Sequence, residues 1–365
     1  MSEKSRHHSS HGHHHHGHHH SHHHESRLKR RLKRWLHKRR WAVLAAVLII
    51  VVIVAAGLWM RRDMKSRSGL EVKAARQMDM AGGYRSIEYN GKTYRYNNRV
   101  TSILYAGIDS EDEIRAAKAF VGAPRADSIS LVVMDERNDR MTIIALSRDT
   151  MTGIHKFTVD GKDRGAFTDH LAFAYTYGDG GEVSCKNLCR AVSDLLFGIP
   201  IDGYVVSNRA SLPILGEAIG PVEVVVPNDD LAAEGFVKGE TAVIDGENLA
   251  SFVRTRDTAG DFTNVSRMER QRAYINGALE KIVNLLTKDS DSAWRLMEQA
   301  EENVLTDITR NRYLDLIRVL KNTYYTGDSY YTPEGRQVVG DLHDEFYPDL
   351  DALHEKVLEL FYLEN

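Results

Sequence analysis

The sequence predicts an α/β domain in which helices flank a central mixed β-sheet, preceded by one transmembrane helix. Three runs rich in apolar and β-branched residues, 101–108, 128–134 and 141–146, are typical of buried strands. Segments with apolar residues at helical spacing follow them, and strands mixed with helices indicate a layered domain. A stretch of twenty uncharged residues, 41–60, precedes all of these elements.

Residues 1–40 form a basic tail rich in histidine. Thirteen histidines lie between His7 and His24, and such a polar tract buries too little apolar surface to offset the entropy lost on ordering. We therefore expect a disordered segment, either inert or able to bind metal through imidazole nitrogen. Nine Lys or Arg between Arg27 and Arg40, in a chain of net charge −3, leave the remainder acidic, so nucleic acid is not an expected partner.

Residues 41–60 are predicted to cross the membrane, because twenty helical residues span a hydrocarbon core of roughly 30 Å. The nine preceding positive charges outnumber the four within 61–67, which predicts a single-pass protein of the cell membrane with a cytoplasmic N-terminus. A signal peptide cleaved near Val54-Ala55-Ala56 is the alternative, but the long basic region and the full-length span favour an anchor. Residues 61–83 then form a stalk near the membrane lipid, and residues 84–365 form an extracellular domain.

The domain is predicted to begin with a β-hairpin, since Asn90-Gly91 separates two alternating runs within 87–96. Further strands are predicted over 222–226 and 249–255. Helices are predicted over 182–197, 267–286, 292–305 and 310–321. The two cysteines, Cys185 and Cys189, share a helical face, where we expect packed thiols rather than a disulfide or a reactive pair.

Charged residues gather where the three apolar strands begin or end. Asp109 follows the first strand, Arg125 and Asp127 open the second, and Arg148 follows the third. The short link 135–140 requires antiparallel pairing of the last two strands, which puts Arg148 beside Asp127. If the first strand is also antiparallel, Asp109 reaches the same edge. Two carboxylates suit Mg²⁺ held jointly with substrate phosphates, whereas a single charge at a strand end is usually only solvated.

A second group of charges lies in 252–271. In a strand, Arg254 and Arg256 share a face, and on the following helix Arg267, Arg270 and Gln271 share another. Facing guanidinium groups repel unless an anion lies between them, and guanidinium binds phosphate in a bidentate manner. A pyrophosphate fits this pattern. Ion pairing with the surplus Asp and Glu is the alternative.

The residues around these charges form six short motifs, at 103–110, 125–128, 145–150, 170–175 with Gly180-Gly181, 219–224 and 252–271. In this order they resemble the LytR-CpsA-Psr family of cell-wall glycopolymer ligases. The resemblance runs from around residue 84 toward the C-terminus and includes 304–308. It implies a sheet flanked by helices, an apolar tunnel for a polyprenyl chain, and a phosphoryl transfer outside the membrane assisted by Mg²⁺, or alternatively Mn²⁺.

The resemblance also assigns residues. Asp109 and Asp127 match the metal-ligating aspartates. The pyrophosphate-binding positions are Arg125, Arg148, Arg254, Arg256, Arg267, Arg270 and Gln271. Among these, Arg148, Arg254 and Arg256 are also expected to be catalytic, together with Asp261, which would orient an arginine or accept a proton. The chain departs from the family in having Ser147 where proline is usual and in the longer spacing 262–266 before Arg267.

The implied activity is transfer of a phosphoglycan, such as teichoic acid or capsule, from a polyprenyl-pyrophosphate carrier to peptidoglycan, which leaves a phosphodiester. A pyrophosphatase that uses water in place of the sugar hydroxyl is an alternative. A membrane-bound transcriptional attenuator is another, but the tail has no helix-turn-helix pattern and suits anionic lipid better. A non-catalytic binder of lipid or polysaccharide is the third, and for it Asp127→Ala would change nothing.

Overall fold

The computed structural model describes residues 86–117, 123–256, 263–284, the backbone of 285–288, residues 291, 294 and 298, and residues 301–326 and 329–364. The tail, the membrane span and the stalk predicted over 1–40, 41–60 and 61–83 lie outside these residues. Within the described residues, no helix is long and apolar enough to cross a membrane.

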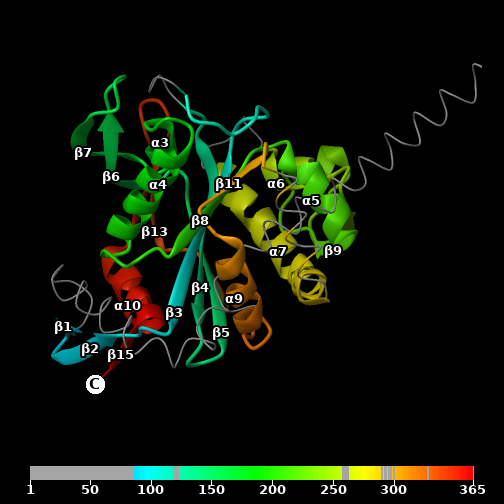
Figure 1. The fold of residues 1–365 in the computed structure, drawn as a ribbon. Coiled ribbons are helices and arrows are strands. Elements are labelled where there is room, and N and C mark those ends of the chain that lie inside the picture. Colours follow the sequence, from blue (N-terminus) through cyan, green and yellow to red (C-terminus); the bar gives the residue numbers. More distant parts are fainter. Residues whose placement is uncertain are drawn as a thin grey trace, which may run out of the picture. The chain divides into compact units, whose positions relative to one another are not determined.

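A six-stranded mixed sheet forms the centre of the domain, as predicted (Figure 1). Its strand order is β11-β8-β3-β4-β5-β12. The strands are β3 (Val100–Ile108), β4 (Ala126–Asp135), β5 (Arg140–Leu146), β8 (Gly203–Ser207), β11 (Val304–Thr306) and β12 (Tyr330–Tyr331). The predicted antiparallel pairing of β4 with β5 is confirmed, and β3 also pairs antiparallel with β4, which is the condition for Asp109 to reach the same edge. Strand β8 runs parallel to β3, and β12 runs parallel to β5.

Two hydrophobic cores lie on opposite faces of this sheet, because successive strand side chains point to opposite sides. Val132 of β4 packs into one core, and its neighbours Leu131 and Val133 pack into the other. The first core is covered by α5 (Ser211–Ile219), α6 (Leu249–Arg254), α7 (Thr263–Lys288) and α9 (Arg310–Leu320). The second is covered by α3 (Phe173–Thr176), α4 (Glu182–Leu195) and α10 (Leu350–Phe361).

Around the central sheet, the described residues form four smaller sheets. The predicted N-terminal hairpin is confirmed as β1 (Ser86–Tyr89) and β2 (Lys92–Tyr96), and β15 (Tyr362–Glu364) adds to it. Its turn residues Asn90 and Gly91 both have positive φ, 50° and 76°, as a type I′ turn requires. The other pairs are β6 (Met151–Phe157) with β7 (Asp163–His170), β9 (Val222–Val225) with β10 (Thr241–Ile244), and β13 (Gly335–Val339) with β14 (Asp344–Pro348). A 3₁₀ turn, η1 (Ala232–Glu234), precedes β10.

The predicted strand over 249–255 is wrong, because this segment is helix α6. Leu249, Phe252 and Val253 are spaced at i, i+3 and i+4 and are buried, so a helix covers the core where a strand would expose half of them. The predicted helix over 292–305 is wrong at its end, where Val304 and Leu305 pair with β8 in strand β11. Half of that segment lies outside the described residues.

The remaining helices and the strand over 222–226 are confirmed as α4, α7, α9 and β9. Cys185 and Cys189 are free thiols on α4, as expected. Cys185 is fully buried in the second core, and Cys189 is half-buried against it.

Candidate active site

The central sheet brings four charged side chains to one edge. Asp109 follows β3, and its amide donates to the carbonyl of Arg125, the residue before antiparallel β4, at 2.9 Å. Arg148 follows β5, which pairs antiparallel with β4 and therefore ends at the same edge. Parallel β8 ends there too, and the amide of Arg209 just beyond it donates to the carbonyl of Ser110 at 2.7 Å.

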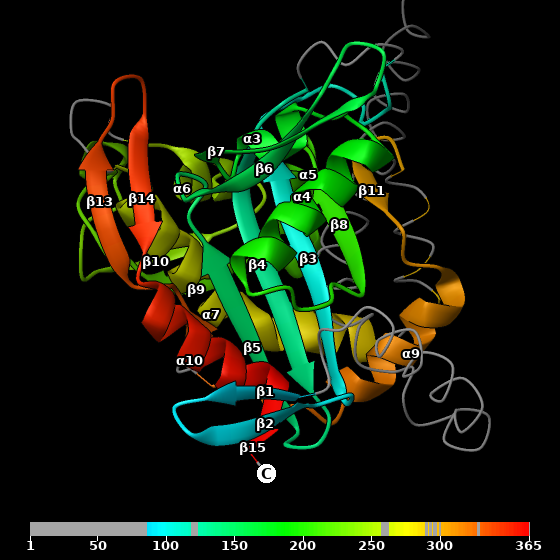
Figure 2. The same ribbon diagram turned by 90° about the vertical axis from the view of Figure 1, so that its left-hand side faces the viewer.

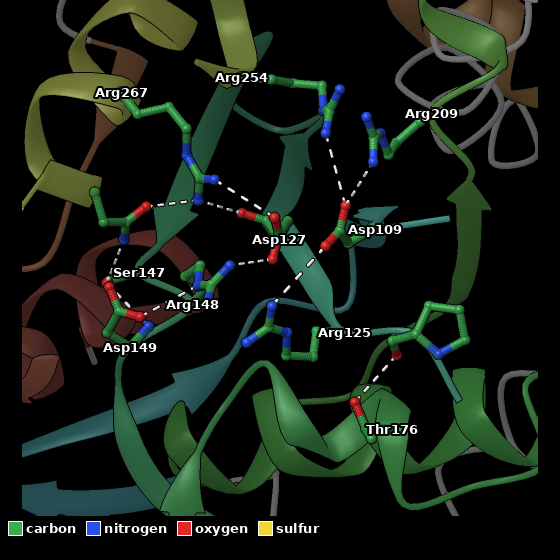
Figure 3. Close-up of polar contacts among 12 residues, drawn as sticks. Asp109, Arg125, Asp127, Ser147, Arg148, Asp149, Thr176, Arg209, Arg254 and Arg267 are labelled. Carbon is green, nitrogen blue, oxygen red and sulfur yellow. Dashed lines mark hydrogen bonds and ion pairs between the residues drawn. The ribbon is translucent and has the colours of Figure 1, made fainter. Parts of the chain in front are cut away.

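Asp127, on β4, lies between two arginines (Figure 3). Its Oδ1 pairs with Nη1 of Arg148, and its Oδ2 lies 3.6 Å from Nη1 of Arg267 on α7. Arg148 is in turn held by Asp149, whose Oδ1 lies 3.2 Å from its Nε. The carboxylate of Asp127 therefore ties the edge of the sheet to α7.

Arg267 is aimed by a chain of hydrogen bonds that begins at Ser147. Asn264 donates from Nδ2 to Ser147 Oγ at 2.9 Å, and its Oδ1 accepts from Arg267 Nη2 at 2.6 Å. Arg267 Nη2 also donates to the Asp127 carbonyl at 2.8 Å. A proline at position 147, which is usual in the family that the sequence resembles, would remove the first acceptor of this chain of bonds.

Asp109 is surrounded by three arginines from three different parts of the chain (Figure 3). Its Oδ1 lies 3.3 Å from Nη1 of Arg209 and 3.6 Å from Nη2 of Arg254, which ends α6. Its Oδ2 lies 3.9 Å from Nη2 of Arg125. These are loose ion pairs, and the Asp109 side chain keeps 30% exposure, so its oxygens remain accessible to another ligand.

The site has a surplus of positive charge. Five arginines face four carboxylates, those of Asp109, Glu111, Asp127 and Asp149, so the arginines exceed the carboxylates by one positive charge. Burial, together with the charges of Arg148 and Arg256, lowers the pKa of Arg267 to about 10, against the pull of Asp127. Burial and the charge of Arg209 likewise lower the pKa of Arg254. The guanidinium groups of Arg254 and Arg267 remain cations at neutral pH. The crowding of cations favours an anion between them.

Two of these arginines also have N–H groups that make no hydrogen bond within the described residues. Arg209 Nε and Arg267 Nε are buried, and neither has a hydrogen-bond partner among the residues that the structure describes. A buried donor without a partner costs about 1–3 kcal/mol, so an acceptor that reached both would stabilise the site.

An apolar cavity of about 130 Å³ opens at this group of charges. It lies between the sheet and helices α5, α6 and α7 and is lined in its depth by Val132, Ile143, Leu215, Leu249, Val253 and Ile275. At its mouth are Asp109, Asp127, Arg209, Arg254 and Arg267. A charged mouth over an apolar interior suits an amphiphile with an anionic head and an apolar tail.

The two aspartates have the chemistry of a partial Mg²⁺ site. Both line the cavity mouth, and Mg²⁺ takes one or two carboxylates together with substrate phosphates and water. Within the described part of the chain, no group of three or more His, Cys, Asp or Glu side chains could hold a metal. The donor set therefore fits an ion that is completed by phosphate oxygens and does not fit a closed protein site.

The structure brings together most of the residues that the sequence singles out. Asp109, Asp127, Arg254, Arg267 and Gln271 line the cavity, and Arg125 and Arg148 contact its two aspartates. Arg256 is half-buried, and its charge acts on Arg267, but it does not line the cavity. Asp261 lies outside the described residues, so its role stays a prediction.

The assignment of Arg270 to pyrophosphate is wrong. Its side chain is fully buried and points away from the cavity toward the C-terminal end of α6. Its Nε donates to the Phe252 carbonyl at 2.9 Å, its Nη1 pairs with Asp230 at 2.9 Å, and its Nη2 donates to the Thr255 carbonyl. The i, i+3 and i+4 spacing on α7 spreads over enough of the helix for Arg267 and Arg270 to point to different neighbours.

The sequence reasoning does not find Arg209 or Asn264, and it notes Asp149 only as a charge that closes the third strand with Arg148, without a role. Arg209 could have been found only by recognising β8, whose short run Tyr204-Val205-Val206 precedes it. Asp149 adjoins Arg148 in sequence, and its carboxylate was an available signal for an ion pair. Nothing in the sequence marks Asn264 as the link between Ser147 and Arg267.

Known proteins resemble this chain over most of its length. The model of the LytR_cpsA_psr family matches residues 66–332. The polyisoprenyl-teichoic acid–peptidoglycan teichoic acid transferase TagU of Enterococcus faecalis is 26% identical over 280 residues, 74% of this chain and 80% of the relative. TagU of Bacillus cereus is 27% identical over 250 residues, 66% of this chain and 69% of the relative.

Solved structures share the fold. The protein gbs0355 of Streptococcus agalactiae superposes with a TM-score of 0.55 at 23% identity, over 72% of this chain and 87% of that protein. A structure described as TagT bound to LIIa-WTA has a TM-score of 0.52 at 20% identity, over 77% of this chain and 96% of its own. At these identities the likeness establishes the arrangement of sheet and helices.

Proposed function

Because the chain belongs to the LytR-CpsA-Psr family, we propose that it transfers a phosphoglycan from a polyprenyl-pyrophosphate carrier to peptidoglycan, forming a phosphodiester. Relatives named as teichoic acid transferases support a glycopolymer transferase. The observation that carries the proposal is the set of three arginines and two aspartates at the mouth of an apolar cavity, with two further arginines paired to these aspartates.

The charge of the site matches the proposed donor. A pyrophosphate diester carries two negative charges, and the five arginines of the site outnumber the four neighbouring carboxylates. The Nε groups of Arg209 and Arg267, which have no partner among the described residues, supply donors for phosphate oxygens. The polyprenyl tail would enter the apolar cavity between the sheet and α5, α6 and α7.

The size of the cavity limits how much of the polyprenyl tail it can hold. Its volume of about 130 Å³ is close to that of an engineered cavity of about 150 Å³ that holds one benzene molecule. It therefore holds only a short segment of a polyprenyl chain. A longer segment requires α5 and α6 to move away from the sheet, or the chain to leave through the mouth.

In the proposed reaction, a sugar hydroxyl oxygen bonds to the phosphorus that carries the glycan. The phosphoanhydride bond breaks, its bridging oxygen departs with the electron pair as the lipid monophosphate, and the hydroxyl proton balances the charge that this phosphate gains. Arg148 and Arg267 would neutralise that charge, and such fixed cations supply most of the catalysis in phosphoryl transfer.

We propose Mg²⁺, with Mn²⁺ as the alternative, as the cofactor, held by Asp109 and Asp127. When bound, the ion would withdraw charge from phosphate oxygens. Removal of the ion by EDTA is expected to abolish transfer, and added Mg²⁺ is expected to restore it.

We also propose that residues 41–60 anchor the chain in the cell membrane, with the catalytic domain on the outer side. The uncharged length of this segment and the nine positive charges before it support this placement. In that position the domain faces both a lipid-linked donor and the wall.

Product analysis tests the proposal. Full-length chain, lipid-linked phosphoglycan and Mg²⁺ are incubated with and without peptidoglycan fragments, and the phosphorus products are identified. We expect a glycan–peptidoglycan phosphodiester that depends on the acceptor. Equal release of lipid phosphate with and without acceptor, and no phosphodiester, would show a pyrophosphatase instead.

A further inference from the structure

A second opening lies on the other side of α7 from the apolar cavity. We call it the hairpin groove, because residues of β13 and β14 form its far wall. Figure 2 shows this hairpin. Its volume is about 940 Å³, in the upper part of the range of ligand sites. Its lining comes from α7, from the loop after β5 and from 332–349, most of which lies beyond the residues that match the family model.

Helix α7 is the wall between the two spaces. Arg267, Gln271 and Tyr274 line the apolar cavity. Val265, Met268 and Arg272 line the hairpin groove. Because residues three and four apart share a helical face, these two sets mark different sides of one helix.

A chain of hydrogen bonds links the linings of the two spaces at the loop after β5. Ser147 lines the hairpin groove, and its Oγ accepts from Asn264, which in turn accepts from Arg267 at the cavity mouth. Ser147 also directly precedes Arg148. A ligand that reaches Ser147 from the groove therefore lies next to the two arginines that flank Asp127.

The hairpin is fixed against the same loop. The amide of Phe346 donates to the carbonyl of Asp149 at 2.8 Å, and Thr150 pairs with Phe346 in a β-bridge. His170 Nε2 lies 3.0 Å from the carbonyl oxygen of Asp344. The far wall of the groove is thus set relative to Arg148 by backbone contacts, as a substrate site requires.

The lining suits a sugar better than a lipid or a phosphate. Glu269, Glu334 and Asp349 alternate with Arg272 and Arg336, so neither sign of charge dominates. Tyr347 stays 37% exposed, and its ring faces the guanidinium of Arg336 at 5.2 Å. Carboxylates and guanidinium groups bond to hydroxyl and amide groups, and an aromatic ring offers a surface on which a sugar face packs.

We propose that the hairpin groove binds the acceptor glycan strand. This inference rests on the proposed transfer and assigns the hairpin groove to its second substrate, the acceptor glycan. The sugar chain lies between α7 and the β13–β14 hairpin, and one hydroxyl at the Ser147 end meets the donor phosphorus at Arg148 and Arg267. That oxygen bonds to phosphorus, the lipid phosphate leaves with the electron pair, and the hydroxyl proton balances its charge.

The test uses full-length protein in detergent micelles and an uncrosslinked, soluble peptidoglycan glycan fragment as the probe. Binding of the fragment is measured without donor by calorimetry, and the acceptor KM and kcat are then measured with lipid-linked donor. The variants are Tyr347→Ala, which removes the exposed ring, and Gln337→Trp, which fills the groove. Leu342→Ala is the control, since Leu342 is 88% exposed on the same hairpin and does not line the groove.

We expect both groove variants to weaken fragment binding and raise the acceptor KM by roughly tenfold, as loss of a central binding side chain does, while kcat at saturating acceptor stays within about twofold for Tyr347→Ala. Leu342→Ala should match the wild type. Unchanged fragment affinity in both groove variants would overturn the proposal. Failure of the proposed function is distinct, because the wild type would then bind the fragment but form no phosphodiester.

Discussion

Arg267 and Arg270 lie almost one turn apart on α7, and their surroundings give them different tasks. Both side chains are buried, at 3% and 0% exposure. The guanidinium group of Arg270 donates hydrogen bonds to Asp230, to Asn228 and to two carbonyls at the end of α6. Arg267 lines the cavity and keeps an unpartnered Nε among the described residues. Arg270 therefore supports the fold, and Arg267 is available to a ligand.

Arg267→Ala is predicted to reduce transfer by about 10²-fold or more, because it removes a fixed cation from the charge that develops on the leaving phosphate. The rate is measured with lipid-linked donor and peptidoglycan at saturating concentrations. The domain should remain folded by circular dichroism, since Asp127 keeps Arg148 as its partner. Arg267→Lys should recover part of the rate, and wild-type activity in Arg267→Ala would remove this arginine from the site.

Arg270→Ala is predicted to lower the free energy of unfolding by about 3–5 kcal/mol, because it leaves Asp230 and two carbonyls of the α6 end without their buried partner. Urea unfolding followed by circular dichroism measures the change. The prediction fails if Arg270→Ala is as stable as the wild type and instead weakens donor binding.

Between elements, the stability of the contact between α6 and α7 is expected to depend on pH. Burial opposes ionisation of Asp230, but hydrogen bonds from Ser266 and Arg270 hold its pKa below the ordinary value. A lowered pKa in the folded state gives stability that is present above the unfolded pKa of about 3.9 and is lost as pH falls through the folded pKa.

Asp230→Asn should therefore destabilise the domain at pH 7 by about 1.5–3 kcal/mol, the range for a hydrogen bond to a charged group. The difference from wild type should shrink in urea unfolding at pH 3. Asp229→Asn, at the neighbouring position, serves as the control. A difference that is constant from pH 7 to pH 3 would rule out the charge of Asp230 as its cause.

Helix α4 holds its two thiols in an unreactive form. Burial raises the pKa of Cys185, and burial followed by the charge of Asp307 raises the pKa of Cys189 to about 12. Compared with a free thiol of pKa about 8.5, this leaves roughly a thousandfold less thiolate at pH 8. We predict that iodoacetamide labels native protein far more slowly than urea-unfolded protein, as measured by mass spectrometry. Equal rates would contradict the packing of these thiols.

The elements that the sequence predicts correctly are those whose signals are local. The link 135–140 is too short for a parallel crossover, so β4 and β5 had to pair antiparallel, and Asn90-Gly91 marks its own turn. The sequence predicts a strand where the structure has six-residue α6, because a buried run this short has no clear period. The pairs β8 with β11 and β13 with β14 were missed, and the first of these joins segments about a hundred residues apart.

At the scale of the whole molecule, the site is assembled from distant parts of the chain. Arg209 follows β8, Arg254 ends α6 and Arg267 lies on α7, and only the folded sheet and helices bring them to Asp109 and Asp127. The charged residues could be selected from the sequence, but which of them meet depends on helix rotation and strand order. Arg270 and Arg209 show the two errors that follow, one included wrongly and one omitted.

The His-rich tail is predicted to be dispensable for transfer, because every described site residue lies after residue 100. Cells that express a chain lacking residues 1–26 should keep wall-bound phosphoglycan close to the full-length level, measured as phosphate in purified walls. A chain lacking residues 1–60 is the comparison and should lose attachment through loss of the proposed anchor. Loss of wall phosphate on removal of 1–26 alone would favour a regulator that acts through the tail.

The charged mouth and the apolar cavity are together proposed to bind a lipid-linked pyrophosphate. Electron density from crystals grown with a short-chain polyprenyl pyrophosphate and Mg²⁺ tests this binding most directly. We predict pyrophosphate density among Arg148, Arg209, Arg254 and Arg267, with the tail between the sheet and α5, α6 and α7. A pyrophosphate bound elsewhere on the domain, with this cavity empty, would contradict the claim.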